Sequence, residues 1–318
     1  MVIMEMILLQ KLDSQYVGKM TEDTGVIAFW EGQNLLYATD TINIRFTAAK
    51  LQALKDEDAG ISEIFYKADT VSFQTYSNGI DAIIAKKLLL EKHKAEMGQS
   101  ISLWKEYAYL AINPAEHPFI KISEYTEEDW FYIGPFRSRF FLIDLVELIS
   151  RLLKLPHCEG KTGPCEKYDD GRCRGWCTLI KSEAGKSEEE NNEQPYLQKL
   201  DALLKEAFVH PDNSLLEMVQ NEKQKYEDKL EFIKAELLKP ELELLKRYKE
   251  WLIFLYKIKS LNYVTDKVSV KNGQLVMFKA EGKEHANPYI EIPYRANETL
   301  AINKNMLDEA RILYQERV

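Results

Sequence analysis

Residues 132–177 read YIGPFRSRFFLIDLVELISRLLKLPHCEGKTGPCEKYDDGRCRGWC, and the rest of the chain is organised around this stretch. All four cysteines of the protein lie at its end, in the spacing C-x6-C-x7-C-x3-C: Cys158, Cys165, Cys173 and Cys177. Four thiolates this close in sequence can surround one inorganic centre. Thiolates suit zinc, copper(I) and iron–sulfur clusters, so the sequence predicts a metal site here.

The spacing favours one kind of centre. Zinc sites usually start from tight C-x2-4-C pairs, and only the last pair here is that close. A looser set of four cysteines suits a [4Fe–4S] cluster, whose negative charge Arg172 and Arg174 could offset. Zinc remains one alternative. Buried structural cysteines or two disulfides are another, although disulfides are rare in the cytosol.

The same stretch resembles the cysteine-bearing linker of the UvrC family, the nuclease subunit of bacterial excinuclease. The matching features are a GP-F-x-S segment at residues 134–138 and a helix after it. The pattern C…PC-x-x-Y-x-x-GRC-x-x-x-C then follows over residues 158–177. The resemblance implies a role in nucleotide excision repair, with an iron–sulfur cluster on the four cysteines.

Composition sets the broad class. The chain has 318 residues, enough for two or three modest domains, and 45% of them are hydrophobic and 29% charged. No apolar run reaches membrane-spanning length, and the apolar opening of the chain lacks the basic start of a signal peptide. We therefore expect a cytoplasmic protein with no membrane partner.

The charge is uneven. The formal net charge of −9 argues against phosphate contacts over the whole surface. Residues 137–181, however, carry nine basic and six acidic side chains, an excess of three positive charges. A local basic face for DNA and an ordinary solvated surface both fit this count.

Residues 24–103 predict a small α/β unit. Strands at 25–30 and 35–38 flank a hairpin turn, a helix follows at 42–54, then a strand at 69–76 and a helix at 78–97. With the helices and hairpins of the later chain, this arrangement places the protein in the α+β class.

This order resembles the GIY-YIG nuclease domain that precedes the cysteine linker in UvrC. Residues 25–27 fall on the GIY triplet, 37–39 on YIG, 81–86 on the family's E-A-L-L-L-E helix and 92–94 on its K-K-H. The resemblance implies an active site of tyrosines, an arginine and a glutamate that binds one divalent metal.

The departures from that pattern decide the expected chemistry. The first tyrosine is Ile27, the arginine is Thr47 and the metal-binding glutamate is Lys86, while Tyr37 keeps its place. Arg45, two residues before Thr47, could restore a guanidinium after a register shift. We expect Tyr37 to be vestigial and the domain not to cut DNA. The alternative is an active, metal-dependent endonuclease with a rearranged site.

Basic side chains in these regions are candidate DNA contacts. They are Arg45 and Lys86 in the N-terminal domain, with Arg172 and Arg174 between the cysteines. A permanent charge at Lys86 could hold a phosphate where the family holds its metal.

Residues 195–260 have helical spacing and predict an antiparallel hairpin. Residues 230–235 resemble the L-E-F-E-x-A segment of the UVR hairpin, which binds UvrB in the family. The implied partner is a UvrB-like or other repair protein, and simple helix packing is the alternative. We expect the surface to use four aromatic residues: Tyr248, Trp251, Phe254 and Tyr256.

The predicted organisation has four consecutive parts. They are a degenerate GIY-YIG-like domain at 1–103, a connector with the cysteines at 104–181, the hairpin at 195–260 and a small α/β unit at 261–318. Within the last part, Asn272-Gly273 marks a β-hairpin, and residues 289–294 are a candidate third strand. A non-enzymatic interaction subunit, with an architectural cluster, is the third functional hypothesis.

Overall fold

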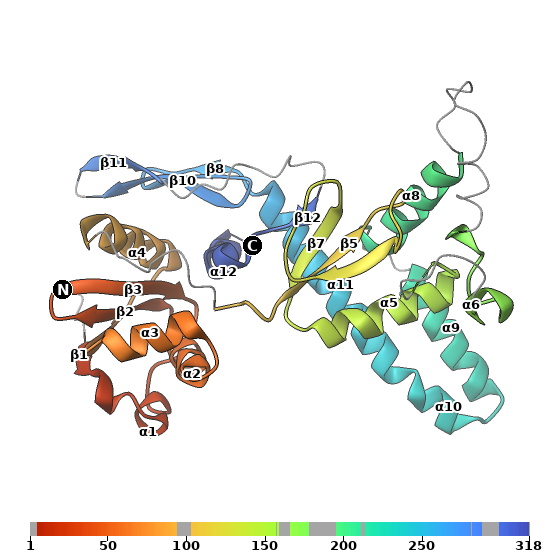
Figure 1. Cartoon of the computed structure of the whole chain (residues 1–318), viewed down its shortest axis with the longest axis horizontal. Helices are drawn as coiled ribbons and strands as arrows, with labels where there is room; N and C mark the ends of the chain where they lie inside the picture. Colours follow the sequence, from red (N-terminus) through yellow and green to blue (C-terminus); the bar gives the residue numbers. More distant parts are fainter. Residues whose placement is uncertain are drawn as a thin grey trace. The chain divides into compact units, whose positions relative to one another are not determined.

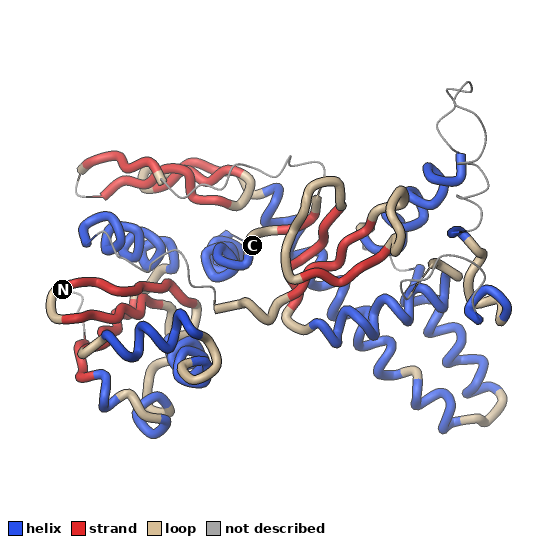
Figure 2. The backbone as a smooth tube through the Cα atoms, in the orientation of Figure 1, coloured by secondary structure: helices blue, strands red, loops and turns tan. Residues whose placement is uncertain are grey.

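The computed structural model describes residues 5–93, 103–156, 158, 166–177, 195–210, 214–280, 282–287 and 299–317. The chain divides into two compact units. Met1–Lys105, Lys257–Tyr294 and Asn303–Val318 make the first, and Glu106–Tyr256 with Arg295–Ile302 makes the second. Each unit combines helices with sheet, which confirms the α+β class (Figures 1 and 2). This division groups the C-terminal elements with the N-terminal ones, unlike the four consecutive parts predicted from the sequence.

The first unit contains an antiparallel sheet in the order β1-β4-β2-β3. Its strands are β1 (Glu5–Leu8), β2 (Gly25–Glu31), β3 (Asn34–Thr41) and β4 (Thr70–Thr75). The predicted hairpin joins β2 to β3 through Gly32, whose φ of +57° a side chain would strain.

Helices cover this sheet, and polar side chains just before several of them cap their first amides. They are η1 (Leu9–Lys11), α1 (Ser14–Val17), α2 (Ile44–Leu54), α3 (Ala59–Lys67) and α4 (Gly79–His93). Asn43 begins α2 by accepting a hydrogen bond from the Phe46 N–H, and Asp58 does the same for the first amides of α3. Among the fully buried side chains are Ile27, Phe29, Leu51, Ile61 and Ile83.

The C-terminal part of the first unit adds a second sheet in the order β11-β10-β9-β8. Its strands are β8 (Tyr263–Val264), β9 (Val268–Lys271), β10 (Gln274–Ala280) and β11 (Lys283–Ala286). Asn272 and Gly273 both have positive φ, 50° and 72°, as the predicted β9–β10 hairpin requires. The strand predicted at 289–294 lies outside the described residues.

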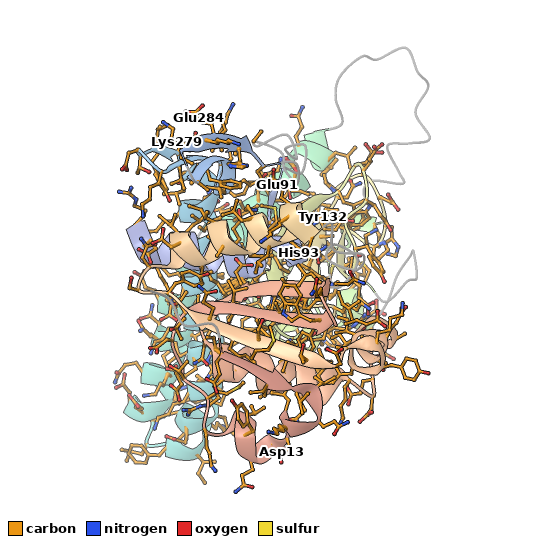
Figure 3. The ribbon with its side chains drawn as sticks, turned by 90° about the vertical axis from the view of Figure 1, so that its left-hand side faces the viewer. Asp13, Glu91, His93, Tyr132, Lys279 and Glu284 are labelled. Atoms are coloured by element: carbon orange, nitrogen blue, oxygen red, sulfur yellow. The ribbon has the colours of Figure 1, made fainter. Side chains whose placement is uncertain are left out.

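An ion pair of 3.1 Å between Lys279 and Glu284 links β10 to β11, and both residues are labelled in Figure 3. The chain then ends in η2 (Lys304–Met306) and α12 (Leu307–Arg317). Helix α12 packs against α4 and β3. The first unit is therefore completed by the last residues of the chain.

The second unit is built on the sheet β12-β7-β5-β6. Its strands are β5 (Ala108–Ile112), β6 (Ile120–Ser123), β7 (Phe131–Phe136) and β12 (Leu300–Ala301). Residues 103–106, before β5, form a turn in which Leu103 and Trp104 are buried.

Helices make up the rest of the second unit. They are α5 (Arg139–Leu153), α6 (Glu166–Asp169), α8 (Pro195–Phe208), α9 (Ser214–Asp228) and α10 (Phe232–Leu237), with α11 (Lys239–Ser260) as far as Tyr256. Ser138 caps α5, and Lys154 ends it in the left-handed conformation. Pro240 stands in the first turn of α11, where its missing N–H removes no helical hydrogen bond.

Candidate functional site

The residues predicted at the vestigial nuclease site come from two elements of the first unit. Tyr37 lies on β3, and Lys86 lies on α4, which packs against that strand. The Lys86 Nζ is 2.5 Å from the Oδ1 of Asp40, three residues beyond Tyr37 on β3. The Asp40 side chain is 1% exposed and that of Lys86 19%. A buried lysine–carboxylate ion pair thus stands where the resemblance places a metal-binding glutamate.

Mutual stabilisation keeps this pair charged. Burial acts against the charged form of Asp40, but Lys86, by charge and hydrogen bond, and then Lys87 hold the pKa of that carboxyl below its ordinary value. Burial likewise lowers the pKa of Lys86, yet Asp40 and then Glu309 outweigh it and raise that pKa above 10.5. The second oxygen of Asp40, Oδ2, is buried and has no hydrogen-bond partner among the described residues.

Tyr37 is a neutral phenol in this environment. Its side chain is 4% exposed, and burial raises the pKa of Tyr37 to about 12 although Lys86 opposes the shift. A tyrosine with that pKa keeps its proton near neutral pH, which disfavours a role as a general base.

The other family positions have become part of the core. Ile27 is fully buried on β2, and Thr47 is buried on α2 with its hydroxyl 2.7 Å from that of Thr41. Arg45 does not replace the lost arginine. Its guanidinium contacts the Glu22 carboxylate and the Met20 carbonyl oxygen, each at 2.7 Å, in the segment before β2.

Two acidic residues of α12 extend the charged cluster, and the sequence analysis missed both. Glu309 Oε2 accepts a hydrogen bond of 2.8 Å from Lys87 Nζ, with both side chains nearly buried at 7% and 8% exposure. Asp308 accepts one of 2.9 Å from the Trp104 indole, and burial raises the pKa of Asp308 to about 6. Two acids in the first turn of a helix also fit a solvated N-terminus, so the local sequence gives no signal of their burial.

The cysteine region is described in part. Cys158 follows α5, Cys173 and Cys177 follow α6, and Cys165 lies outside the described residues. The Gly175 N–H donates to the Cys173 Sγ at 3.4 Å, and the Cys173 N–H donates to the Lys167 carbonyl oxygen at 2.8 Å. An amide directed at sulfur suits a thiolate ligand of a metal or cluster. Across the described ranges no three Cys, His, Asp or Glu side chains gather as a metal site.

The arginines between the cysteines have different surroundings. Arg172 forms an exposed ion pair of 2.6 Å with Asp170, and Arg174 is exposed. Gly171 and Gly175 have positive φ, 69° and 74°, which lets the backbone turn tightly in this segment.

The helical region corrects the predicted interaction surface. Tyr248 is 4% exposed and donates to the Phe208 carbonyl oxygen, and Tyr256 donates to that of Val209 at 2.7 Å. Trp251 donates to the Pro135 carbonyl oxygen at 2.9 Å and packs on Phe254, with 4.7 Å between ring centroids. These four aromatic residues hold the second unit together. The prediction that they are exposed anchors is wrong.

Apolar side chains are exposed elsewhere, around the junction of α9 and α10. We call them the α9–α10 patch: Leu230 (74% exposed), Phe232 (61%), Ile233 (82%) and Leu237 (69%). Leu230, Phe232 and Ile233 lie in the segment that resembles the UVR hairpin.

Comparisons with known proteins point to one family. No family model matches the chain. The UvrABC system protein C of Fervidobacterium nodosum is 23% identical over 170 residues, covering 52% of this chain and 30% of that protein. That of Dictyoglomus thermophilum is 22% identical over 245 residues, covering 74% of this chain and 39% of that protein. The matched region spans between about a fifth and two fifths of the length of such relatives.

A solved structure also matches. The GIY-YIG N-terminal endonuclease domain of UvrC from Thermotoga maritima, bound to magnesium, has 17% sequence identity and a TM-score of 0.25. It covers 26% of this chain and 92% of that one. In the described part of the chain, no helix is long and apolar enough to cross a membrane. By sequence, the chain is therefore similar to UvrC proteins over part of their length.

Proposed function

We propose that this chain is a UvrC-like protein of nucleotide excision repair that binds DNA or a repair partner and does not cleave DNA. The observation that carries this proposal is the buried Lys86–Asp40 ion pair at the position where the family binds its metal. Phosphodiester cleavage of this type uses the metal to neutralise developing negative charge. The ammonium group of Lys86, on α4, repels a cation and is paired with the buried Asp40 carboxylate.

The neighbouring side chains give no substitute for that metal. Thr47 supplies a hydroxyl already used by Thr41, and Tyr37 stays protonated near neutral pH. Losing one electrostatic stabiliser of a transition state commonly slows a reaction by about 10²–10³. Here the metal ligand and the arginine are replaced together.

A nicking assay tests this proposal. Purified protein with Mg²⁺ or Mn²⁺ should leave nicked, bubble and damaged duplexes uncut. Cleavage by the wild type that disappears in the variant Tyr37→Phe would show an active nuclease and refute the proposal. A Tyr16→Phe variant, altered at a phenol that hydrogen-bonds Glu5 instead, is the matched control.

DNA contact is proposed through basic side chains whose present partners differ. Arg174 is exposed, and Arg172 has one exposed partner, Asp170. Lys86 and Arg45 already contact Asp40 and Glu22, so DNA would have to compete with those carboxylates. Affinity that falls steeply with salt would support phosphate contact. Affinity too weak to measure at low salt would favour the interaction-subunit hypothesis.

The four cysteines are proposed to hold a [4Fe–4S] cluster, with zinc as the alternative. Such a cluster supplies a rigid, multiply bonded joint, or redox chemistry. Cys158, Cys165, Cys173 and Cys177 would be its ligands, and the Gly175 N–H would stabilise the Cys173 thiolate. Anaerobically prepared protein should contain iron and sulfide and lose its colour in the variant Cys173→Ser. Stoichiometric zinc without iron would refute this assignment.

A protein partner is proposed for the α9–α10 patch. Exposed Phe232 and Ile233 are apolar side chains of the kind that anchor interfaces, and the resemblance to the UVR hairpin suggests a UvrB-like protein.

A further inference from the structure

The acidic side of α12 is the strongest feature that the proposed function leaves unused. Glu309 is 6% and Asp308 7% exposed, and both lie on α12, the helix that packs against α4 and β3. Carboxylates are almost never this buried unless they are paired. The partners of these two carboxylates therefore indicate which kind of ligand the adjoining face of α4 could bind.

Glu309 connects three elements. One carboxylate oxygen accepts from Lys87 Nζ at 2.8 Å, on α4, and the other accepts from the Leu275 N–H at 3.2 Å, on β10. The charge of Glu309 also acts on Lys86, the next residue along α4. A carboxylate that accepts from a lysine and a backbone amide makes the contacts that a phosphate oxygen would make.

Two further contacts fix α12 on the start of α4. Glu316 Oε1 accepts from the Gly79 N–H at 2.7 Å. Ile312 packs so closely that a Cβ on Gly79 would lie 2.3 Å from its Cγ2. The helix thus lies against α4 at its first residue and again at Lys87, two turns further on.

We propose that α12 is an internal acidic ligand of α4, with Glu309 holding Lys87 as a nucleic-acid phosphate would, and that DNA reaches Lys87 only when α12 is displaced. This role rests on the proposed DNA binding of the chain and names how it is controlled. The closed form keeps the lysines neutralised from within. An opened form frees Lys87 on α4, whereas Lys86 keeps its ion pair with Asp40 on β3.

Charge reversal on α12 tests this role. Glu309→Lys repels Lys87 and should open the helix, whereas Glu57→Lys adds the same charge at an exposed position of the same unit. Both variants gain equally in general attraction to DNA. In fluorescence anisotropy with a short labelled duplex at about 50 mM salt, we expect Glu309→Lys to bind at least about fivefold more tightly than Glu57→Lys. Adding Lys87→Gln should reduce that difference.

A reversible disulfide between α4 and α12, called the lock below, makes the comparison independent of any general effect on folding. A Cβ at position 79 would stand 3.5 Å from the Ile312 Cβ, within the range for a disulfide. Gly79→Cys with Ile312→Cys, added to Glu309→Lys, should bind like Glu57→Lys when oxidised and more tightly when reduced. The unlocked variants, given the same redox treatments, control for effects on the native cysteines.

The outcomes separate the two ideas. Equal affinities of Glu309→Lys and Glu57→Lys, or a gain that survives the oxidised lock, would overturn the role of α12 while leaving the DNA-binding function standing. No DNA binding by any form would overturn both. DNA cleavage by the wild type would refute the proposed lack of activity, and the affinities of Glu309→Lys and Glu57→Lys would still decide the role of α12.

Discussion

The α4–β3 face of the first unit and the α9–α10 patch of the second are opposite kinds of surface. On the first, Lys86, Asp40, Lys87 and Glu309 are charged groups buried in ion pairs within the chain. On the second, the apolar side chains Phe232 and Ile233 are 61% and 82% exposed. Charges that would serve catalysis or DNA are satisfied internally, whereas side chains that would serve a core are in solvent. This difference is consistent with the proposal that a protein partner binds the α9–α10 patch.

The largest effect should come from breaking the buried ion pair. Lys86→Gln leaves the Asp40 carboxylate buried beside a neutral group, which should lower the free energy of unfolding by about 3–5 kcal/mol. Urea denaturation of the full chain measures this. Lys67→Gln, which breaks the exposed pair with Glu63, is the control and should cost less than about 1 kcal/mol. Similar losses in both variants would mean that the Lys86–Asp40 ion pair is not buried in the folded protein.

Removing an aromatic side chain from α11 comes next. Trp251→Ala loses the hydrogen bond to Pro135 and the packing on Phe254, so we expect a loss of about 2–3 kcal/mol in the second unit. Tryptophan fluorescence is altered by the change itself, so circular dichroism is the better measurement. A variant that folds as stably as the wild type but no longer binds a protein partner would support the original prediction that Trp251 is an exposed anchor.

A smaller effect, of opposite sign, is expected at α12. Because burial raises the pKa of Asp308 to about 6 from 3.8, the folded state binds its proton more tightly than the unfolded state. The stability due to this group is complete below about pH 4 and is lost as the pH rises through about 6. Asp308→Asn keeps an acceptor for Trp104 and does not titrate. It should therefore be more stable than the wild type at pH 7 by about 1–2 kcal/mol. This figure includes the loss of the ion pair between Asp308 and Arg311.

The pH series supplies the check on that explanation. The advantage of Asp308→Asn should shrink between pH 6 and pH 4, and the exposed variant Asp56→Asn serves as the control. An advantage that is constant across this range would point to packing and not to the charge.

The smallest effect on stability should occur at the α9–α10 patch. Ile233→Ser changes an 82% exposed side chain and should shift the free energy of unfolding by less than about 0.5 kcal/mol. Binding to a purified UvrB protein, measured by calorimetry, should nevertheless weaken by about tenfold. The exposed variant Val264→Ser, on β8, controls for general loss of apolar surface. Equal binding by both variants would argue against the patch.

The local features of this protein follow from its sequence. Asn272-Gly273 specifies the β9–β10 hairpin because both residues accept positive φ, and Ser138 begins α5 because its hydroxyl accepts an amide of the first turn. The spacing of the cysteines and the departures at Ile27, Thr47 and Lys86 are likewise visible without coordinates. The hairpin and capping signals lie within a few residues of the structure that they determine.

Tertiary structure alone decided what the charged and aromatic side chains do. Lys86 meets Asp40 across 46 residues, and Lys87 meets Glu309 across 222. A lysine on a helix reads the same in sequence whether it binds DNA or neutralises a buried acid. Trp251 likewise reads the same whether it is an exposed anchor or a donor to Pro135. Burial depends on which distant element packs against a residue, and that sets both the desolvation cost of a charge and the partner that offsets it.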